Sequence, residues 1–192
     1  MNNIVLKAKD FESISRIALK EASQALSRML NQEIKVVSSS VLMLSPLDLI
    51  DVLGRELPTE VVASYSEFKG MIEGIILMVI PLEHAANTAK SLIESLLGTT
   101  MLDEEMAIDL LKEIANIIFG SIASSMYNKY GLVIKYSVPK VVIDNFIAIL
   151  DNIALMYVTK LEKVIVMNAE IIGGKGIHVK ILIIPKERWL HQ

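Results

Sequence analysis

The chain has 192 residues, of which 53% are hydrophobic and 21% are charged, and its formal net charge is −3. This length allows one domain with a full core, and the acidic balance argues against a nucleic-acid-binding protein, which usually carries a basic patch. The absence of cysteine excludes disulfides, thiolate metal sites and a cysteine nucleophile, and three scattered histidines do not suggest a zinc site.

The mean hydropathy of +0.49 raises the question of membrane insertion. The two most apolar stretches, 71–82 and 141–158, are interrupted by Glu73 and by Asp144 and Asp151. Neither stretch offers the ~20 uninterrupted apolar residues that a membrane-spanning helix needs. The N-terminal apolar stretch is too short for a signal peptide. We therefore expect a cytoplasmic protein without membrane insertion.

The first half of the chain predicts one long helix followed by strands. Asp10 is a suitable N-cap for a helix that ends near Asn31. The elements expected after this helix are a strand over 34–44, a loop or short helical turn over 46–57, a β-hairpin of strands 61–68 and 71–80, and a helix from Pro81 to about Leu97 that is closed by Gly98.

The second half repeats this order. Acidic residues at 103–105 suit the first turn of a helix that runs to about Tyr130 and ends at Gly131. The elements expected after it are strands over 132–138 and 141–143, a turn or short helix over 144–151, strands over 153–158, 164–172 and 177–184, and a turn at 173–176. We expect the tail, 185–192, to be exposed.

The helix expected over 103–130 has an unusual polar face. At about 100° per residue, Asp109, Glu113, Asn116 and Gly120 fall on one side, opposite an apolar stripe that marks the buried side. A glycine inside a helix costs ~1 kcal/mol relative to alanine, so Gly120 suggests that another group must approach closely there.

The two halves align when the chain is shifted by one hundred residues, which places Arg16 on Asn116 and Ser39 on Pro139. An internal duplication explains this order, with one half at about 9–98 and the other at about 103–185. The sequence therefore predicts a single α+β domain of two repeats. We expect a shared, mainly antiparallel β-sheet with the two long helices on one face.

Four residues of the second half match a spaced motif: an acidic residue or serine, three residues, Glu, two residues, Asn, 22 residues, Pro. Asp109, Glu113, Asn116 and Pro139 occupy its positions. With this motif and its duplicated layout, the chain resembles the CheC/CheX/FliY family of chemotaxis phosphatases, most closely the CheC members, over nearly its whole length.

The resemblance implies that the protein dephosphorylates the aspartyl-phosphate of a CheY-like response regulator. Glu113 would anchor the regulator, and Asn116 would orient the attacking water. Asp109, Gly120 and Pro139 would support the site. The resemblance implies no cofactor in this chain, because the Mg²⁺ ion would belong to the partner regulator. A CheD-like deamidase is a candidate second partner.

The first half departs from this motif. It has Lys9 at the acidic position, Ser13 at the Glu position, Arg16 at the Asn position and Ser39 at the Pro position, with Lys20 where the second half has Gly120. Serine cannot form the ion pair, and arginine has no acceptor for a water proton. We expect one active site, and we interpret the basic face of this helix as ordinary solvent-exposed surface or a second docking patch.

Two other functions remain open at this stage. One is a non-catalytic binding module for a CheD-like partner or a regulator, and the other is a structural component of the motility switch. The intact Glu–Asn pair favours the phosphatase over both. Ser121, Ser124 and Ser125 have no base placed to activate them, so we expect packing or solvent exposure rather than a nucleophile.

Overall fold

The structure is a computed structural model that describes residues 8–55, 57, 59–98, 103–155, 164–173 and 177–185. Its helices are α1 (Ala8–Leu30), α2 (Pro46–Leu53), α3 (Leu82–Leu97), α4 (Glu104–Tyr130) and α5 (Phe146–Ile153). Its strands are β1 (Ile34–Leu44), β2 (Glu60–Gly70), β3 (Gly74–Pro81), β4 (Ile134–Tyr136), β5 (Lys140–Asn145), β6 (Val164–Gly173) and β7 (Ile177–Pro185). None of the helices in these ranges is long and apolar enough to span a bilayer.

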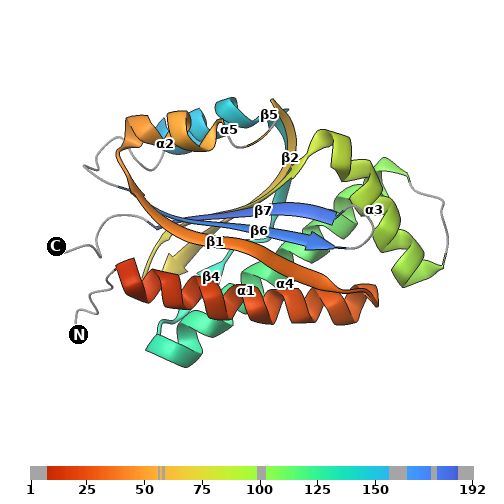
Figure 1. The fold of residues 1–192 in the computed structure, drawn as a ribbon, viewed down its shortest axis with the longest axis horizontal. Coiled ribbons are helices and arrows are strands. Elements are labelled where there is room, and N and C mark those ends of the chain that lie inside the picture. Colours follow the sequence, from red (N-terminus) through yellow and green to blue (C-terminus); the bar gives the residue numbers. More distant parts are fainter. Residues whose placement is uncertain are drawn as a thin grey trace.

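The strands form one antiparallel sheet in the order β1-β6-β7-β3-β2-β4, with β5 also paired to β2 (Figure 1). Within the described residues, β1 is therefore the outermost strand at one edge. At the other edge, β4 and β5 pair with successive stretches of β2, so they resemble one strand with a break between them. The break contains Pro139, which cannot donate a backbone hydrogen bond to a ladder.

Helices cover both faces of the sheet (Figure 1). The long helices α1 and α4, together with α3, bury one core that includes Phe11, Ile118 and Phe119. The short helices α2 and α5 bury a second core on the opposite face, which includes Leu49 and Phe146. The predicted α+β fold with an antiparallel sheet and the long helices on one face is confirmed.

Capping residues explain why most of the predicted helix boundaries agree with the structure. Gly98 and Gly131 adopt the left-handed conformation at the ends of α3 and α4, with φ of 64° and 67°. A left-handed C-cap is a conformation that glycine adopts without steric cost. Ser45 caps α2 by accepting a hydrogen bond from the backbone N–H of Asp48, so residues 46–53 are a true helix.

One predicted strand is wrong where the structure describes it. The stretch 153–158 begins inside α5, whose helical conformation extends through Leu155, and the rest of it lies outside the described residues. The error has a physical cause, since a short apolar run is compatible with a buried strand or a buried helix. Asn145 favours the helix as its N-cap, because its side chain accepts a hydrogen bond from the N–H of Ile147.

Smaller differences concern turns and ends. The hairpin between β2 and β3 turns at 71–73 rather than at 69–70, and Gly70 has φ of 145° just before it. The strand expected over 132–138 is limited to Ile134–Tyr136. The glycine-rich turn at 174–176 and the tail after Pro185 lie outside the described residues.

Candidate functional site

The helix that carries the motif, α4, is fixed at both ends. At its N-terminus the Asp103 carboxylate accepts a hydrogen bond of 2.8 Å from the N–H of Met106. At its C-terminus the N–H of Gly131 donates to the carbonyl of Tyr127 at 2.8 Å. These contacts pair backbone groups that a helix otherwise leaves without partners. The motif positions lie in the interior turns, so their spacing along the helix is well defined.

Hydrogen bonds also fasten α4 to α1. The buried hydroxyl of Ser125 donates to a Glu21 carboxylate oxygen at 2.9 Å. The Lys129 ammonium donates to the Ser13 hydroxyl, and the Tyr130 hydroxyl donates to a carboxylate oxygen of Asp10 at 3.3 Å. Ser125 therefore has a packing role, as expected. The Ser121 hydroxyl donates to the carbonyl of Ile117, one turn earlier.

Glu113 and Asn116 lie on the outer face of α4, where Glu113 is exposed and Asn116 is half-buried. Neither side chain makes a hydrogen bond or an ion pair within the part of the chain that the structure describes. A carboxylate and a carboxamide one turn apart, both without a partner among the described residues, can contact a molecule that approaches this face. The helix itself holds them at a fixed separation.

Asp109, the acidic residue of the motif, is engaged within the helix. Its carboxylate lies 2.9 Å from the Lys112 ammonium, and its side chain is 66% exposed. Ion pairs this exposed contribute little to stability, on the order of 0–1 kcal/mol. Asp109 could release Lys112 at small cost, so the pair can rearrange when a partner approaches.

The close approach predicted at Gly120 is made by this chain itself. A Cβ atom at Gly120 would lie 3.2 Å from the Tyr136 hydroxyl of β4. The Tyr136 ring is also packed edge-on against Phe119, with ring centroids 6.2 Å apart. Gly120 therefore gives the Tyr136 hydroxyl room on the face of α4, one turn beyond Asn116.

Tyr136 is a polar group of this face that the sequence analysis missed. It belongs to a short strand, and the contact joins positions 16 residues apart through two different elements. Helical periodicity carries no signal for such a contact. The unexplained glycine in the helix was the available clue, because it indicated that some group comes close.

Pro139 is buried in the break between β4 and β5. Ser137, two residues before Pro139, makes two hydrogen bonds to β2. Its N–H donates to the Glu67 carbonyl at 2.9 Å, and its carbonyl accepts from the Ser66 hydroxyl at 2.7 Å. Val138 between them is 78% exposed. Pro139 therefore shapes the backbone beside α4, and the structure gives it no exposed surface for a ligand.

The corresponding residues of the first half are arranged differently. Ser13 accepts its hydrogen bond from Lys129, while Arg16 and Lys20 are exposed on α1. Ser39 of β1 shares a hydrogen bond of 2.8 Å with Ser15, which joins β1 to α1. This surface has neither a carboxylate nor a carboxamide at the two central motif positions.

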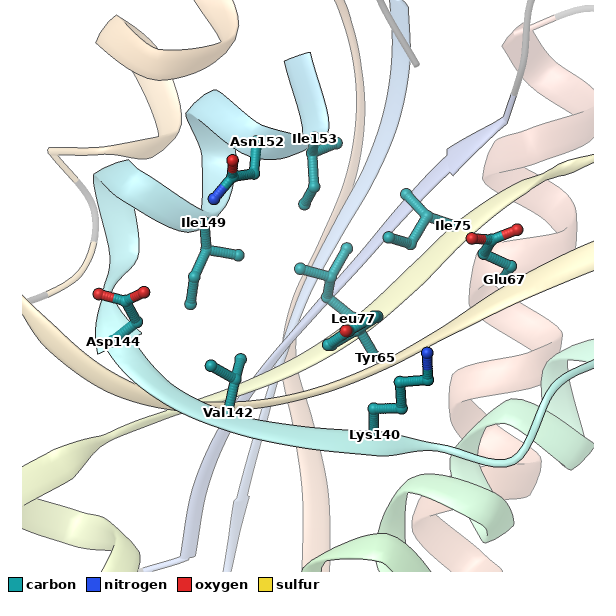
Figure 2. Close-up of a pocket in the computed structure, with 10 residues that line it drawn as sticks. All are labelled: Tyr65, Glu67, Ile75, Leu77, Lys140, Val142, Asp144, Ile149, Asn152 and Ile153. Atoms are coloured by element: carbon teal, nitrogen blue, oxygen red, sulfur yellow. The ribbon is translucent and has the colours of Figure 1, made fainter. Parts of the chain in front are cut away.

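A cavity of about 380 Å³ lies on the opposite face of the sheet, beside α5 (Figure 2). Figure 2 shows Ile149 and Ile153 of α5 pointing toward Leu77 and Val142 of the strands. None of the motif residues lines this cavity. In the described part of the chain, no group of three or more His, Cys, Asp or Glu side chains could hold a metal ion.

Comparison with known proteins shows the family of this chain. The family model of the chemotaxis phosphatase CheX matches residues 62–157, which is half of the chain and includes Asp109, Glu113, Asn116 and Pro139. The chain belongs to the CheC/CheX/FliY family. The matching model is that of CheX, so the narrower expectation of a CheC member stays a prediction. No curated protein matches the chain.

Solved structures of CheC/CheX/FliY proteins share the fold. Thermotoga maritima FliY is 23% identical, with a TM-score of 0.67 over 97% of this chain and 94% of that chain. A Desulfovibrio desulfuricans CheX is 13% identical, with a TM-score of 0.61 over 91% of this chain and 99% of that chain. The CheX-CheY-BeF3-Mg²⁺ complex from Borrelia burgdorferi is 19% identical, with a TM-score of 0.61 over 90% of this chain and 97% of that chain.

Proposed function

We propose that this protein dephosphorylates the aspartyl-phosphate of a CheY-like response regulator through Glu113 and Asn116. The observation that carries the proposal is that both side chains lie on the outer face of a capped helix without partners among the described residues. The chain's place in a family of chemotaxis phosphatases and the solved complex of a relative with CheY support the choice of substrate.

Asn116 acts on the attacking water. A carboxamide accepts a hydrogen bond from water through its oxygen and donates to a phosphoryl oxygen through its NH₂ group, and it has no charge to repel the phosphoryl group. Phosphoryl transfer depends on positioning and on stabilising charge, and it needs no covalent step on the helper protein. Asn116 can therefore promote hydrolysis while the phosphoryl group stays in the regulator's own site.

Glu113 anchors the regulator. Its exposed carboxylate lies one turn before Asn116, so an ion pair with a cationic side chain of the regulator would fix the position of the carboxamide. The Mg²⁺ ion would belong to the regulator. Binding of a CheD-like deamidase stays a prediction that needs its own pull-down experiment.

The test is the decay of the phosphorylated cognate CheY-type regulator with and without this protein. We expect faster decay with the wild type, and decay at the regulator's intrinsic rate with Asn116→Ala. Asn116→Asp should also be inactive, because a carboxylate repels the phosphoryl group. Glu113→Ala should require a higher protein concentration for the same rate, because it removes the anchor.

Asn128→Ala is the matched control, since Asn128 is an exposed asparagine of the same helix outside the motif. It should keep the wild-type rate. Residual acceleration with Asn116→Ala would contradict the single-site proposal and direct attention to α1. Unchanged decay with the wild type and a confirmed cognate regulator would favour a non-catalytic binding module.

A further inference from the structure

A groove lies between α1 and β1, and the proposed function does not use it. It encloses about 600 Å³. Its lining combines the polar face of α1 with the middle of β1: Lys9, Glu12, Ser13, Arg16, Ser39, Ser40 and Val41. Under the proposed duplication, Arg16 and Ser39 occupy the positions of Asn116 and Pro139 in the other half, so this groove is the counterpart of the candidate phosphatase site.

The charge of this groove is positive although the whole chain is acidic. Lys9 and Arg16 are exposed in its wall, Lys20 continues the same face of α1 one turn further, and the Lys129 ammonium reaches its Ser13 hydroxyl. The one carboxylate that lines it is Glu12. The groove thus concentrates cations, which favours an anionic ligand.

Three of these cations have no ion-pair partner among the residues that the structure describes. Lys9, Arg16 and Lys20 form no ion pair with any residue in the described ranges. By contrast, Lys35, Arg55, Lys69 and Lys112 each pair with a nearby carboxylate. A ligand carboxylate could pair with Arg16 or Lys9 without first breaking an internal ion pair. Because exposed ion pairs contribute little to stability, this saving is small, and the main effect is that the three cations are available to a ligand.

The other wall of the groove is β1, which is an edge strand of the described sheet. β1 pairs with β6 alone in the described sheet, and its middle residues, Val37–Ser40, are all exposed. The register shifts between Val36 and Ser38, which marks a β-bulge at this point. An edge strand presents unpaired N–H and C=O groups, which lysine, proline or a β-bulge can protect. The bulge here lies at the start of the exposed stretch, and residues 38–40 beyond it contain neither lysine nor proline.

We propose that the groove between α1 and β1 binds an extended acidic segment of a partner protein. The segment would add to the outer edge of β1 through backbone hydrogen bonds, with alternate side chains directed toward α1. Its carboxylates would then pair with Arg16 and Lys9. Ser39 is already joined to Ser15 by a hydrogen bond, so its hydroxyl is engaged with α1.

The arrangement favours a protein segment over a nucleic acid. Glu12 lies within the groove and Asp10 lies close by on α1, and both would repel a continuous phosphate backbone. Carboxylates spaced at every second residue can match Lys9 and Arg16 while avoiding Glu12. The free backbone edge adds affinity for a polypeptide and offers nothing specific to a polynucleotide.

The experiment measures fluorescence anisotropy of a labelled peptide of about ten residues in which Glu and Thr alternate, so that the acids share one face of a strand. We expect the full-length protein to bind it and the double variant Lys9→Gln/Arg16→Gln to bind it about tenfold more weakly. Added salt should weaken binding by the wild type more than binding by this variant. Binding of the peptide should also slow hydrogen exchange of the amides at 37–40.

Lys90→Gln/Lys135→Gln is the matched control, since both lysines are exposed and lie outside the groove. It should bind the peptide like the wild type. Absence of wild-type binding, equal binding by the groove variant, or equal binding of a peptide with Gln in place of Glu would overturn the proposal. Tighter binding of a single-stranded DNA of similar length would also overturn it, because the groove would then be a nucleic-acid site. The result does not depend on phosphatase activity.

Discussion

Gly120 lowers the helix propensity of α4 but leaves room for a contact with Tyr136. Alanine at this position would gain ~1 kcal/mol of helix propensity. Its Cβ, however, would lie 3.2 Å from the Tyr136 hydroxyl, which is closer than most such contacts. The two effects oppose each other, so the tyrosine hydroxyl determines whether the substitution is tolerated.

We expect Gly120→Ala to leave the free energy of unfolding unchanged or lower it in the wild-type background. In a Tyr136→Phe background, which lacks the hydroxyl, the same change should stabilise the protein by about 1 kcal/mol. Urea unfolding of the four proteins measures this coupling. An equal effect in both backgrounds would show that the hydroxyl does not explain the glycine.

The positions of some motif residues could be predicted from the sequence, whereas the contacts of others could not. Helical periodicity was sufficient to place Glu113 and Asn116 on an outer face, because both belong to one regular element. The engagement of Asp109 by Lys112 depends on a side-chain rotamer, and the contact of Gly120 depends on how β4 meets α4. Neither follows from local pattern.

At the scale of the elements, the contact between α1 and α4 includes a titratable group, the Tyr130 hydroxyl. The pKa of Tyr130 is raised above its ordinary value, mainly because the hydroxyl is partly removed from water and further because the Asp10 carboxylate disfavours a second negative charge. A raised pKa in the folded state means that the neutral tyrosine is the form that folding favours. The contribution of neutral Tyr130 to the free energy of unfolding is fully present below about pH 10, and it is lost as the pH rises through the folded-state pKa.

We therefore expect the free energy of unfolding to fall as the pH rises above about 10. Tyr130→Phe should make this fall shallower, because phenylalanine does not ionise. Tyr127→Phe is the control, since Tyr127 belongs to the same helix and is 59% exposed. Urea unfolding at several alkaline pH values compares the slopes. Equal slopes for the two variants would refute the role of Tyr130.

The N-cap of α4, Asp103, should contribute measurably to stability. Asp103→Ala should lower the free energy of unfolding by about 1 kcal/mol, because the N–H of Met106 loses its acceptor. Asp103→Asn should retain most of the stability, since asparagine is an equally good N-cap. Thermal unfolding followed by circular dichroism measures both. An undiminished stability in the alanine variant would mean that water replaces the carboxylate without cost.

The elements were predictable where a boundary has its own chemistry. Glycines after α3 and α4, and Asp103 before α4, defined the helix ends from the sequence. The stretch 153–158 lacks such a boundary signal, since the decisive cap, Asn145, precedes it by eight residues. The order of strands in the sheet could not be predicted, because pairings such as β1 with β6 join segments far apart in the chain.

On the scale of the whole molecule, one sheet separates two cores. Leu150 of α5 is fully buried in the core opposite to α4. Leu150→Ala should lower the free energy of unfolding by about 2–5 kcal/mol, as expected for a buried leucine. Dephosphorylation per folded molecule should be unchanged, because the sheet lies between Leu150 and Glu113. Urea unfolding and the regulator decay assay, run on the same sample, would measure both quantities. A decay rate that falls along with stability would show coupling through the sheet.

The central position of Glu113 and Asn116 in a capped helix has a consequence for heat inactivation. Helix ends fray and loops open locally before a protein unfolds, whereas the interior turns of a packed helix separate only with the core. Neither Glu113 nor Asn116 lies on a loop that could open first. Loss of activity on heating should therefore coincide with the main unfolding transition, and the protein should keep its full rate until a few degrees below it.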